Sequence, residues 1–218
     1  MLRYEEHQLA SRQIAVGETR TRDSLPAAPH RPKLNGPESM DIGMNRYVAL
    51  LRAVNVGGTG KLPMVELRSM CESLGWQQAR TYIASGNVIF ASAESAEHCK
   101  QQLENALEDY AGKPVGVMLR NAAEMAQVLA DNPFKDAPGN RVVAIFLDDP
   151  PPADLLDGVS GQRNERIGAG KREVYVHYED GMGDSKLRVA AARTGTARNI
   201  NTVGKLVRMV GVEFLSVA

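Results

Sequence analysis

The sequence predicts a mixed α/β (α+β) protein made of two ferredoxin-like βαββαβ halves with antiparallel sheets, plus a C-terminal helix. Two observations carry this prediction. A strand, helix, hairpin, helix and strand follow one another from residue 46 to residue 120, and a similar order of elements recurs from residue 141 onward. The likeness of the two halves lies in this order and only weakly in identical residues.

The first half opens with a nearly continuous apolar run, residues 46–53, which is typical of a central strand and ends in a glycine-rich exit. A helix is expected next, because apolar residues repeat with helical spacing between a proline suited to its first turn and a glycine suited to its end. These apolar positions are Met64, Leu67, Cys71 and Leu74.

Residues 81–84 and 88–91 flank a Ser-Gly-Asn sequence that is typical of a tight turn, so they are predicted to form a hairpin. A second helix is expected before Gly112, and residues 114–119 are predicted to close the half as its fourth strand. The apolar face of that helix is expected to consist of Cys99, Leu103, Ala106, Leu107 and Tyr110.

A linking helix and loop are expected over residues 121–140, because Asn121 and Glu124 have the spacing of a capping box. The second half, residues 141–218, begins with another apolar run. Its elements are predicted as a strand at 141–147, a short helix at 153–159, a hairpin at 167–170 and 174–178, a helix around 187–191 and a last helix around 203–210.

Residues 1–43 differ from the two halves that follow, 44–120 and 141–218. They hold 4 of the 11 prolines and few large apolar residues, so we expect a disordered extension that cannot bury enough apolar surface to fold. Met40 and Met44 stand just before the first strand. An equally simple expectation is therefore that translation starts there.

The composition is that of a globular protein with one or two domains, since 43% of the 218 residues are hydrophobic and 24% are charged. The 26 basic and 26 acidic side chains cancel, which excludes a strongly basic nucleic-acid binder as a description of the whole chain. Two cysteines cannot form a disulfide framework, and no cysteine or histidine spacing suggests zinc. We therefore expect a cytoplasmic protein with no metal, no cofactor and no membrane span.

The loop at residues 55–61 joins the first strand to the first helix and contains Gly57, Gly58 and Gly60. Glycines allow backbone N–H groups to approach a ligand, and Lys61 supplies a positive charge at a helix N-terminus. The loop departs from the P-loop pattern. A site for an anion and a plain turn with an exposed lysine remain open as interpretations.

Residues 185–208 contain six basic residues and no acidic one, a local charge of +6. Such a stretch often contacts phosphate, although two amphipathic helices with solvated basic faces are the alternative. Within it, residues 196–202 are expected to be a polar connector that presents Arg198, with Asn201 or Thr202 as a cap of the last helix. The basic residues are Lys186, Arg188, Arg193, Arg198, Lys205 and Arg208.

Four segments in matching order resemble a bacterial family, the domain-of-unknown-function family 1697. They are RYVALLRAVNVGGTGKLPM (46–64), TYIASGNVIF (81–90), GMGDSKL (181–187) and TARNINTVGKL (196–206). The resemblance covers about residues 44–211 and implies an α/β protein of ferredoxin-like halves. It implies no activity, so a function has to be inferred from the residues. The family pattern usually starts where Met44 stands.

The polar and glycine positions of these segments fall at strand ends, turns and helix starts, where side chains can converge on a cleft between the two halves. Cations and amides with few carboxylates suit an anionic ligand. The predicted ligand-binding residues are Arg52, Asn55, Gly57, Gly58, Lys61, Ser85, Asn87, Ser185, Lys186, Arg198 and Asn199.

Three functions compete. The leading hypothesis is a binding protein for a phosphate-bearing small molecule or a nucleic-acid backbone, held between Lys61 and the region of Lys186 and Arg198. The second is an enzyme acting on a phosphorylated small molecule, but the sequence offers no evident general base and no catalytic residue is assigned. The third is a non-catalytic module that self-associates into a homo-oligomer. No membrane partner is expected.

Overall fold

The computed structural model describes residues 43–55 and 61–211. The described residues all belong to one compact unit of the chain, residues 41–218. The expected extension at 1–43 lies, apart from Gly43, outside the described residues, as do Gly57 and Gly58. The boundaries predicted at residues 120 and 141 stay a prediction.

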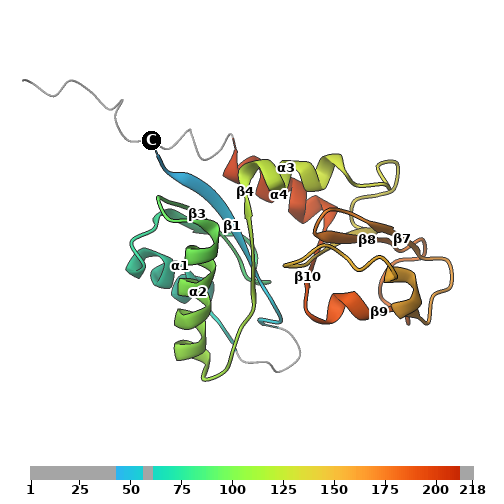
Figure 1. Cartoon of the computed structure of the whole chain (residues 1–218), viewed down its shortest axis with the longest axis horizontal. Coiled ribbons are helices and arrows are strands. Elements are labelled where there is room, and N and C mark those ends of the chain that lie inside the picture. Colours follow the sequence, from blue (N-terminus) through green and yellow to red (C-terminus); the bar gives the residue numbers. More distant parts are fainter. Residues whose placement is uncertain (1–42, 56–60, 212–218) are drawn as a thin grey trace, which may run out of the picture. The chain divides into compact units, whose positions relative to one another are not determined.

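The first sheet has four antiparallel strands in the order β2-β3-β1-β4, with α1 and α2 on the same side of it (Figure 1). The predicted βαββαβ order of elements is present in this half. Its elements are β1 (Asn45–Leu51), α1 (Met64–Ser73), β2 (Gln77–Thr81), β3 (Asn87–Ser92), α2 (Ala96–Ala111) and β4 (Val117–Asn121).

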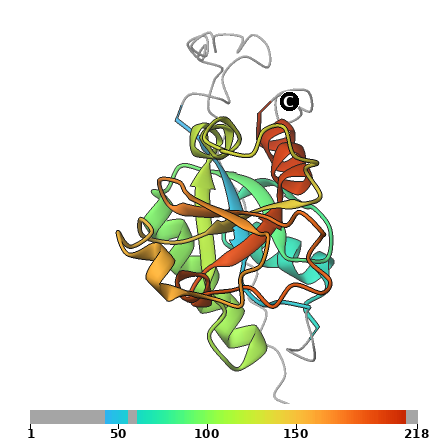
Figure 2. The ribbon, with the colours of Figure 1, turned by 90° about the vertical axis from the view of Figure 1, so that its right-hand side faces the viewer.

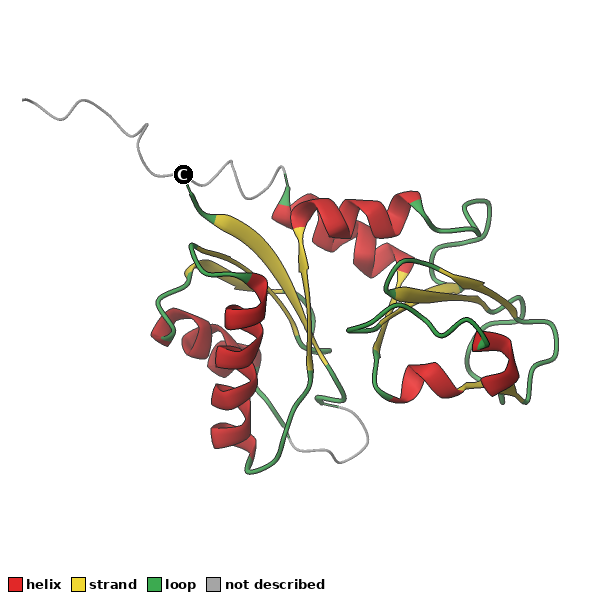
Figure 3. Cartoon of the chain, viewed as in Figure 1, coloured by secondary structure: helices red, strands yellow, loops and turns green. Residues whose placement is uncertain are grey.

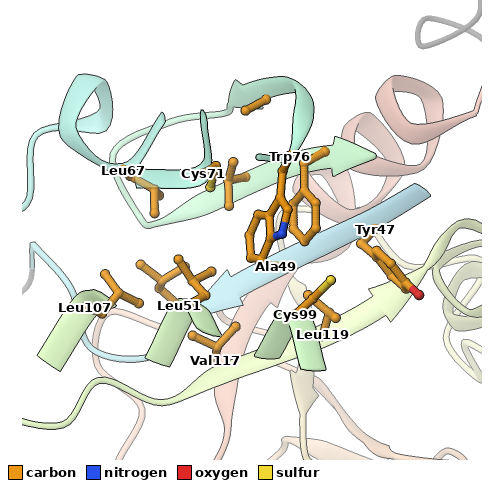
Figure 4. Packing of buried hydrophobic residues seen from close by; sticks show 14 of the residues in the cluster. Tyr47, Ala49, Leu51, Leu67, Cys71, Trp76, Cys99, Leu107, Val117 and Leu119 are labelled. Atoms are coloured by element: carbon orange, nitrogen blue, oxygen red, sulfur yellow. The ribbon is translucent and has the colours of Figure 1, made fainter. Parts of the chain in front are cut away.

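The helices of this half begin and end where the sequence places their signals. Ser95 caps α2 by accepting a hydrogen bond from the His98 N–H, and Gly112 ends α2 in the left-handed conformation at φ 66°. Trp76 stacks on Phe90 with ring centroids 3.8 Å apart, in a core that also buries most of the two predicted apolar stripes (Figure 4). Leu67, Cys71, Cys99, Leu103 and Leu107 are buried in it, while Met64, Leu74 and Ala106 are only partly buried. Tyr110 is the exception, since 47% of its surface is exposed.

The predicted capping box of the linking helix is confirmed. Asn121 accepts a hydrogen bond from the Glu124 N–H at 2.8 Å, and the Glu124 carboxylate accepts one from the Asn121 N–H at 2.8 Å. The helix that follows is α3 (Ala122–Ala130), and α4 (Ile200–Val210) packs beside it. Together with the second sheet they cover the face of the first sheet that α1 and α2 leave open (Figure 3).

The second sheet is also antiparallel, with the order β10-β5-β8-β7. The prediction of two four-stranded antiparallel sheets with a C-terminal helix is thus confirmed, while the finer ferredoxin-like classification stays a prediction. The strands of this half are β5 (Val142–Phe146), β6 (Val159–Ser160), β7 (Arg166–Ala169), β8 (Glu173–His177), β9 (Arg188–Val189) and β10 (Thr196–Asn199), with β6 and β9 forming a separate pair.

The two inner helices predicted for the second half are each a single 3₁₀ turn, η1 (Leu155–Gly158) and η2 (Ala190–Arg193). The reason is room. Three prolines precede η1 and Gly158 ends it, while η2 has only four residues between β9 and the turn that leads into β10. Neither segment is long enough for a stable α-helix.

Residues 196–202 were expected to be a connector, but residues 196–199 form the edge strand β10, which runs directly into α4 (Figure 2). Asn199, rather than Asn201 or Thr202, caps that helix by accepting a hydrogen bond from the Thr202 N–H at 2.8 Å. Within residues 43–55 and 61–211, no helix is both long and apolar enough to cross a membrane.

Candidate functional site

The chain leaving β1 is held by the side chain of Asn55. Its amide nitrogen donates to the carbonyls of Leu62 at 2.9 Å and Ala84 at 2.8 Å, and its oxygen accepts from the Leu62 N–H at 2.8 Å. Ala53 and Asn55 both have positive φ, 52° and 56°, which asparagine tolerates better than most residues. Asn55 therefore fixes the exit of β1 against both α1 and the hairpin.

The hairpin turn facing this exit is also strained. β2 ends at Thr81, so the strand predicted at 81–84 is wrong beyond its first residue, and Ile83 has a φ of 52°. Gly86 has a φ of 76°, and a Cβ there would lie 2.4 Å from Val54 Cγ2, so only glycine fits. Strained backbone tends to gather where the surrounding structure holds a loop in one arrangement.

Arg198, on β10, is buried against both of these loops. Its Nε donates to Asn87 Oδ1 at 2.5 Å and its Nη1 to the Thr196 hydroxyl and the Ala197 carbonyl, both at 2.8 Å. Its Nη2 donates to the carbonyls of Leu51, Ser85 and Gly86 at 3.0, 2.8 and 3.2 Å. Every N–H of the guanidinium is therefore engaged inside the chain.

The acceptors around Arg198 are all neutral. No described carboxylate lies within salt-bridge distance of it, and burial lowers the pKa of its guanidinium to about 10. It remains a cation at neutral pH, held by carbonyl, amide and hydroxyl dipoles. We conclude that Arg198 joins the second half of the chain to the turn and strand end of the first.

Asn87 completes this junction. The side chain is fully buried, and its amide nitrogen donates to the Tyr82 carbonyl at 2.8 Å and to the Ser85 hydroxyl at 3.0 Å. The structure thus brings together four predicted site residues, Asn55, Ser85, Asn87 and Arg198. Their polar atoms are directed at one another and at backbone groups, which is the pattern of a structural network.

Ser185 and Lys186 belong to another loop. The Ser185 hydroxyl donates a short hydrogen bond to the Glu165 carboxylate and accepts one from the Leu187 N–H at 3.1 Å. The hydroxyl of Ser185 lowers the pKa of Glu165, with a further contribution from the Arg163 N–H. Lys186 is exposed. The hydrogen bonds of Ser185 fix its own loop and do not join the junction around Arg198.

A cavity of about 440 Å³ opens where β1 ends and β4 begins. Two predicted site residues line it, Arg52 and Lys61, and Lys113 adds a third cation. The described part of its lining contains no acidic residue. The lining consists of Arg52, Ala53, Val54, Lys61, Leu62, Leu107, Tyr110, Ala111, Lys113, Pro114, Val115 and Gly116.

The cavity depends on strand pairing for its position. Leu51 pairs with Val117 across the antiparallel β1–β4 ladder, so the end of β1 lies beside the start of β4. The Arg52 N–H donates to the Gly116 carbonyl at 2.9 Å. Arg52 also reaches the second half, since its Nη2 donates to the Arg193 carbonyl at 2.5 Å.

Lys113 and Tyr110 were missed from the sequence. Lys113 stands between the glycine that ends α2 and the proline before β4, where a lysine is unremarkable by itself. What brings the loop 112–116 to the cavity is the pairing of β4 with β1, which places this loop beside the end of β1.

A buried ion pair joins the two sheets. Arg120 and Glu173 form a buried salt bridge at 2.9 Å that joins β4 to β8, beside a cavity of only about 80 Å³. Burial lowers the pKa of Arg120, opposed by the charge of Glu173. In the part of the chain that the structure describes, no group of three or more His, Cys, Asp or Glu side chains is arranged to hold a metal ion.

Comparison with known proteins gives a family but no activity. Residues 44–175 match the sequence model of the family "Protein of unknown function (DUF1697)". A similar solved structure is that of the conserved bacterial protein SP0830 from Streptococcus pneumoniae, with a TM-score of 0.64 and 25% identity. The match covers 77% of this chain and 99% of that one. No curated protein matches the chain.

Proposed function

This chain belongs to the DUF1697 family of proteins of unknown function, and we propose that it binds an anionic small molecule in the cavity lined by Arg52, Lys61 and Lys113. The single observation that carries the proposal is this set of three cations around one cavity, with no acidic residue among the described lining residues. An anion bound there would offset the repulsion between the three charges.

The three cations come from separate parts of the first half. Arg52 follows β1, Lys61 precedes α1, and Lys113 lies between α2 and β4. A ligand that contacts all three would be surrounded by positive charge. The volume of about 440 Å³ lies within the range of cavities that bind small molecules.

Arg52 is the residue best suited to an acid group. A guanidinium presents its donors in a planar fork that matches a carboxylate or a phosphate. Its Nη2 donates to the Arg193 carbonyl at 2.5 Å, and its side chain makes no other hydrogen bond with the described residues. That one bond orients the group and leaves donors for a ligand.

Arg198, Asn87, Asn55 and Ser85 have a supporting role in this proposal. They hold the end of β1 and the facing turn, and thereby fix Ala53 and Val54 in the cavity wall. Asn199 caps α4. The proposed site thus lies mainly on the first half, with Arg193 of the second half fixing Arg52.

The test is a thermal-shift and calorimetric titration of the whole protein with inorganic phosphate, glucose 6-phosphate and octyl phosphate at low salt. A ligand at a hundred times its Kd stabilises the native state by about 2.7 kcal/mol. We expect the double substitution Arg52→Ala with Lys61→Ala to abolish the stabilisation. The matched control is Arg188→Ala, which removes an exposed cation elsewhere and should leave the stabilisation intact.

Two results would refute the proposal. One is the absence of binding by all three anions to a folded protein. The other is equal loss of binding in the Arg188→Ala control, which would point to general attraction by positive charge. A nucleic-acid backbone as the natural ligand would instead give steep salt dependence with short RNA or DNA, because several phosphate contacts release several counterions.

A further inference from the structure

The walls of the cavity between the three cations are apolar. Val54, Leu62, Leu107 and Val115 contribute aliphatic side chains. Among the described lining residues, Tyr110 alone carries a side-chain hydroxyl, and there is no asparagine, glutamine, serine, threonine or carboxylate. The side chains that the structure describes in the lining thus offer positive charge and apolar surface, with almost no hydrogen-bond acceptors.

This composition discriminates between classes of anion. A sugar phosphate or a nucleotide carries hydroxyl or amino groups that need acceptors when they leave water, and an unpaired polar group costs free energy on burial. An alkyl or aryl chain has no such need and gains from contact with aliphatic walls. The lining therefore favours an acid group attached to an apolar body.

The volume sets the size of that body. At about 30 Å³ for each water-sized group, a cavity of about 440 Å³ holds about 15 such groups. A phosphate or carboxylate uses three to five of them by its count of non-hydrogen atoms. The remainder suits a chain of roughly ten to twelve carbons, or an aromatic group of similar size.

We infer that the ligand is an amphiphilic anion, in which one phosphate or carboxylate contacts Arg52, Lys61 and Lys113 and an apolar chain or ring lies against Val54, Leu62 and Leu107. This inference rests on the proposed function, because it names the class of anion that the same cavity takes. The charged group gives orientation, and the apolar body supplies the preference over hydrophilic phosphates.

The experiment compares butyl, hexyl, octyl and dodecyl phosphate with glucose 6-phosphate by calorimetric titration of the whole protein. Each methylene buried against the wall should tighten binding by about threefold to fourfold. The gain should level off between octyl and dodecyl phosphate, because the cavity is then full. Titrations stay below the concentration at which each alkyl phosphate forms micelles.

A substitution that preserves the charges tests the wall directly. A Cβ on Gly116 would meet Arg52 Cδ at 3.7 Å, an ordinary contact, so a methyl group at position 116 fits beside Arg52. Gly116→Leu should fill part of the cavity and reduce the gain per methylene. Gly116→Ala, which adds one methyl group, is the matched control and should reduce that gain less.

The outcomes separate this inference from the proposed function. Affinity that rises with chain length and then levels off, with a smaller rise in Gly116→Leu, supports both. Glucose 6-phosphate binding as tightly as octyl phosphate, with loss in Arg52→Ala, would overturn the inference and keep the proposed function. Equal gains through dodecyl phosphate in all variants would indicate general detergent-like binding and overturn the inference. Binding of no anion would overturn both.

Discussion

Arg52 and Arg198 belong to the same set of predicted site residues, yet the structure uses their guanidinium groups in opposite ways. Arg198 is 7% exposed and donates to six acceptors within the chain. Arg52 is exposed, lines a cavity, and donates from its side chain to one carbonyl among the described residues. The two lie in adjacent regions, since Arg198 binds the carbonyl of Leu51, the residue before Arg52.

The difference shows how to separate structural from ligand-binding cations. A ligand at Arg198 would have to displace internal acceptors and leave buried carbonyls unpaired, which costs more than the new bond returns. A ligand at Arg52 would displace water. The junction around Arg198 therefore fixes the edge of the cavity, and Arg52 is the guanidinium on which a ligand could bind without displacing a network of internal acceptors.

The largest effect is expected from Arg198→Met, which keeps much of the side-chain volume and removes all its donors. Buried carbonyls at Leu51, Ser85 and Gly86 and the Asn87 amide oxygen would lose their partner. We expect the free energy of unfolding to fall by about 3 kcal/mol or more. Urea denaturation monitored by circular dichroism measures it.

Arg198→Lys sharpens this test because it keeps the positive charge and reduces five donors to three. We expect most of the loss to remain, since the number and direction of the donors, and not the charge, hold the junction. Full stability in Arg198→Lys would show that the charge alone matters. Full stability in Arg198→Met would contradict the conclusion that Arg198 is a structural residue.

A smaller effect is expected at Asn55, where two substitutions separate the hydrogen bonds from the backbone strain. Both Asn55→Gly and Asn55→Ala lose the three bonds to Leu62 and Ala84, which should cost about 2 kcal/mol. Alanine alone is also penalised at a φ of 56°, by about 1 kcal/mol more. Chemical denaturation of the two variants measures the difference, and equal stabilities would show that this strain is absent.

Much of the first half could be predicted because its signals are local. The apolar run of β1 and the stripe of α1 each depend on residues close together in the chain, as does the Asn121–Glu124 capping box of the linking helix. The structure contains all three elements. The second half was harder. Its inner helices are short 3₁₀ turns between prolines, strands and glycines. The edge strand β10 is mostly polar, and its sequence does not alternate between apolar and polar residues.

The site could be predicted only in part. Arg52 and Lys61 were among the predicted ligand-binding residues, and both line one cavity. The burial of Arg198 and Asn87 was not foreseeable from the sequence, because it depends on β10 packing against a turn more than a hundred residues earlier in the chain. Lys113 was missed because it reaches the cavity only through the pairing of β4 with β1, which joins segments far apart in the chain.

The smallest effect on stability is expected from Arg52→Met, the same substitution at the other arginine of the comparison. The lost bond to the Arg193 carbonyl is exposed, and removing one of three cations around a cavity relieves repulsion. We therefore expect a change in the free energy of unfolding within about 0.5 kcal/mol. At low salt the repulsion of Arg52 by the other two cations in the parent protein is least screened. The variant should therefore gain stability relative to the parent protein as the salt concentration falls. Urea denaturation at two salt concentrations measures both effects. A loss as large as that of Arg198→Met would mean that Arg52, too, is a structural residue, and would remove the main cation from the proposed site.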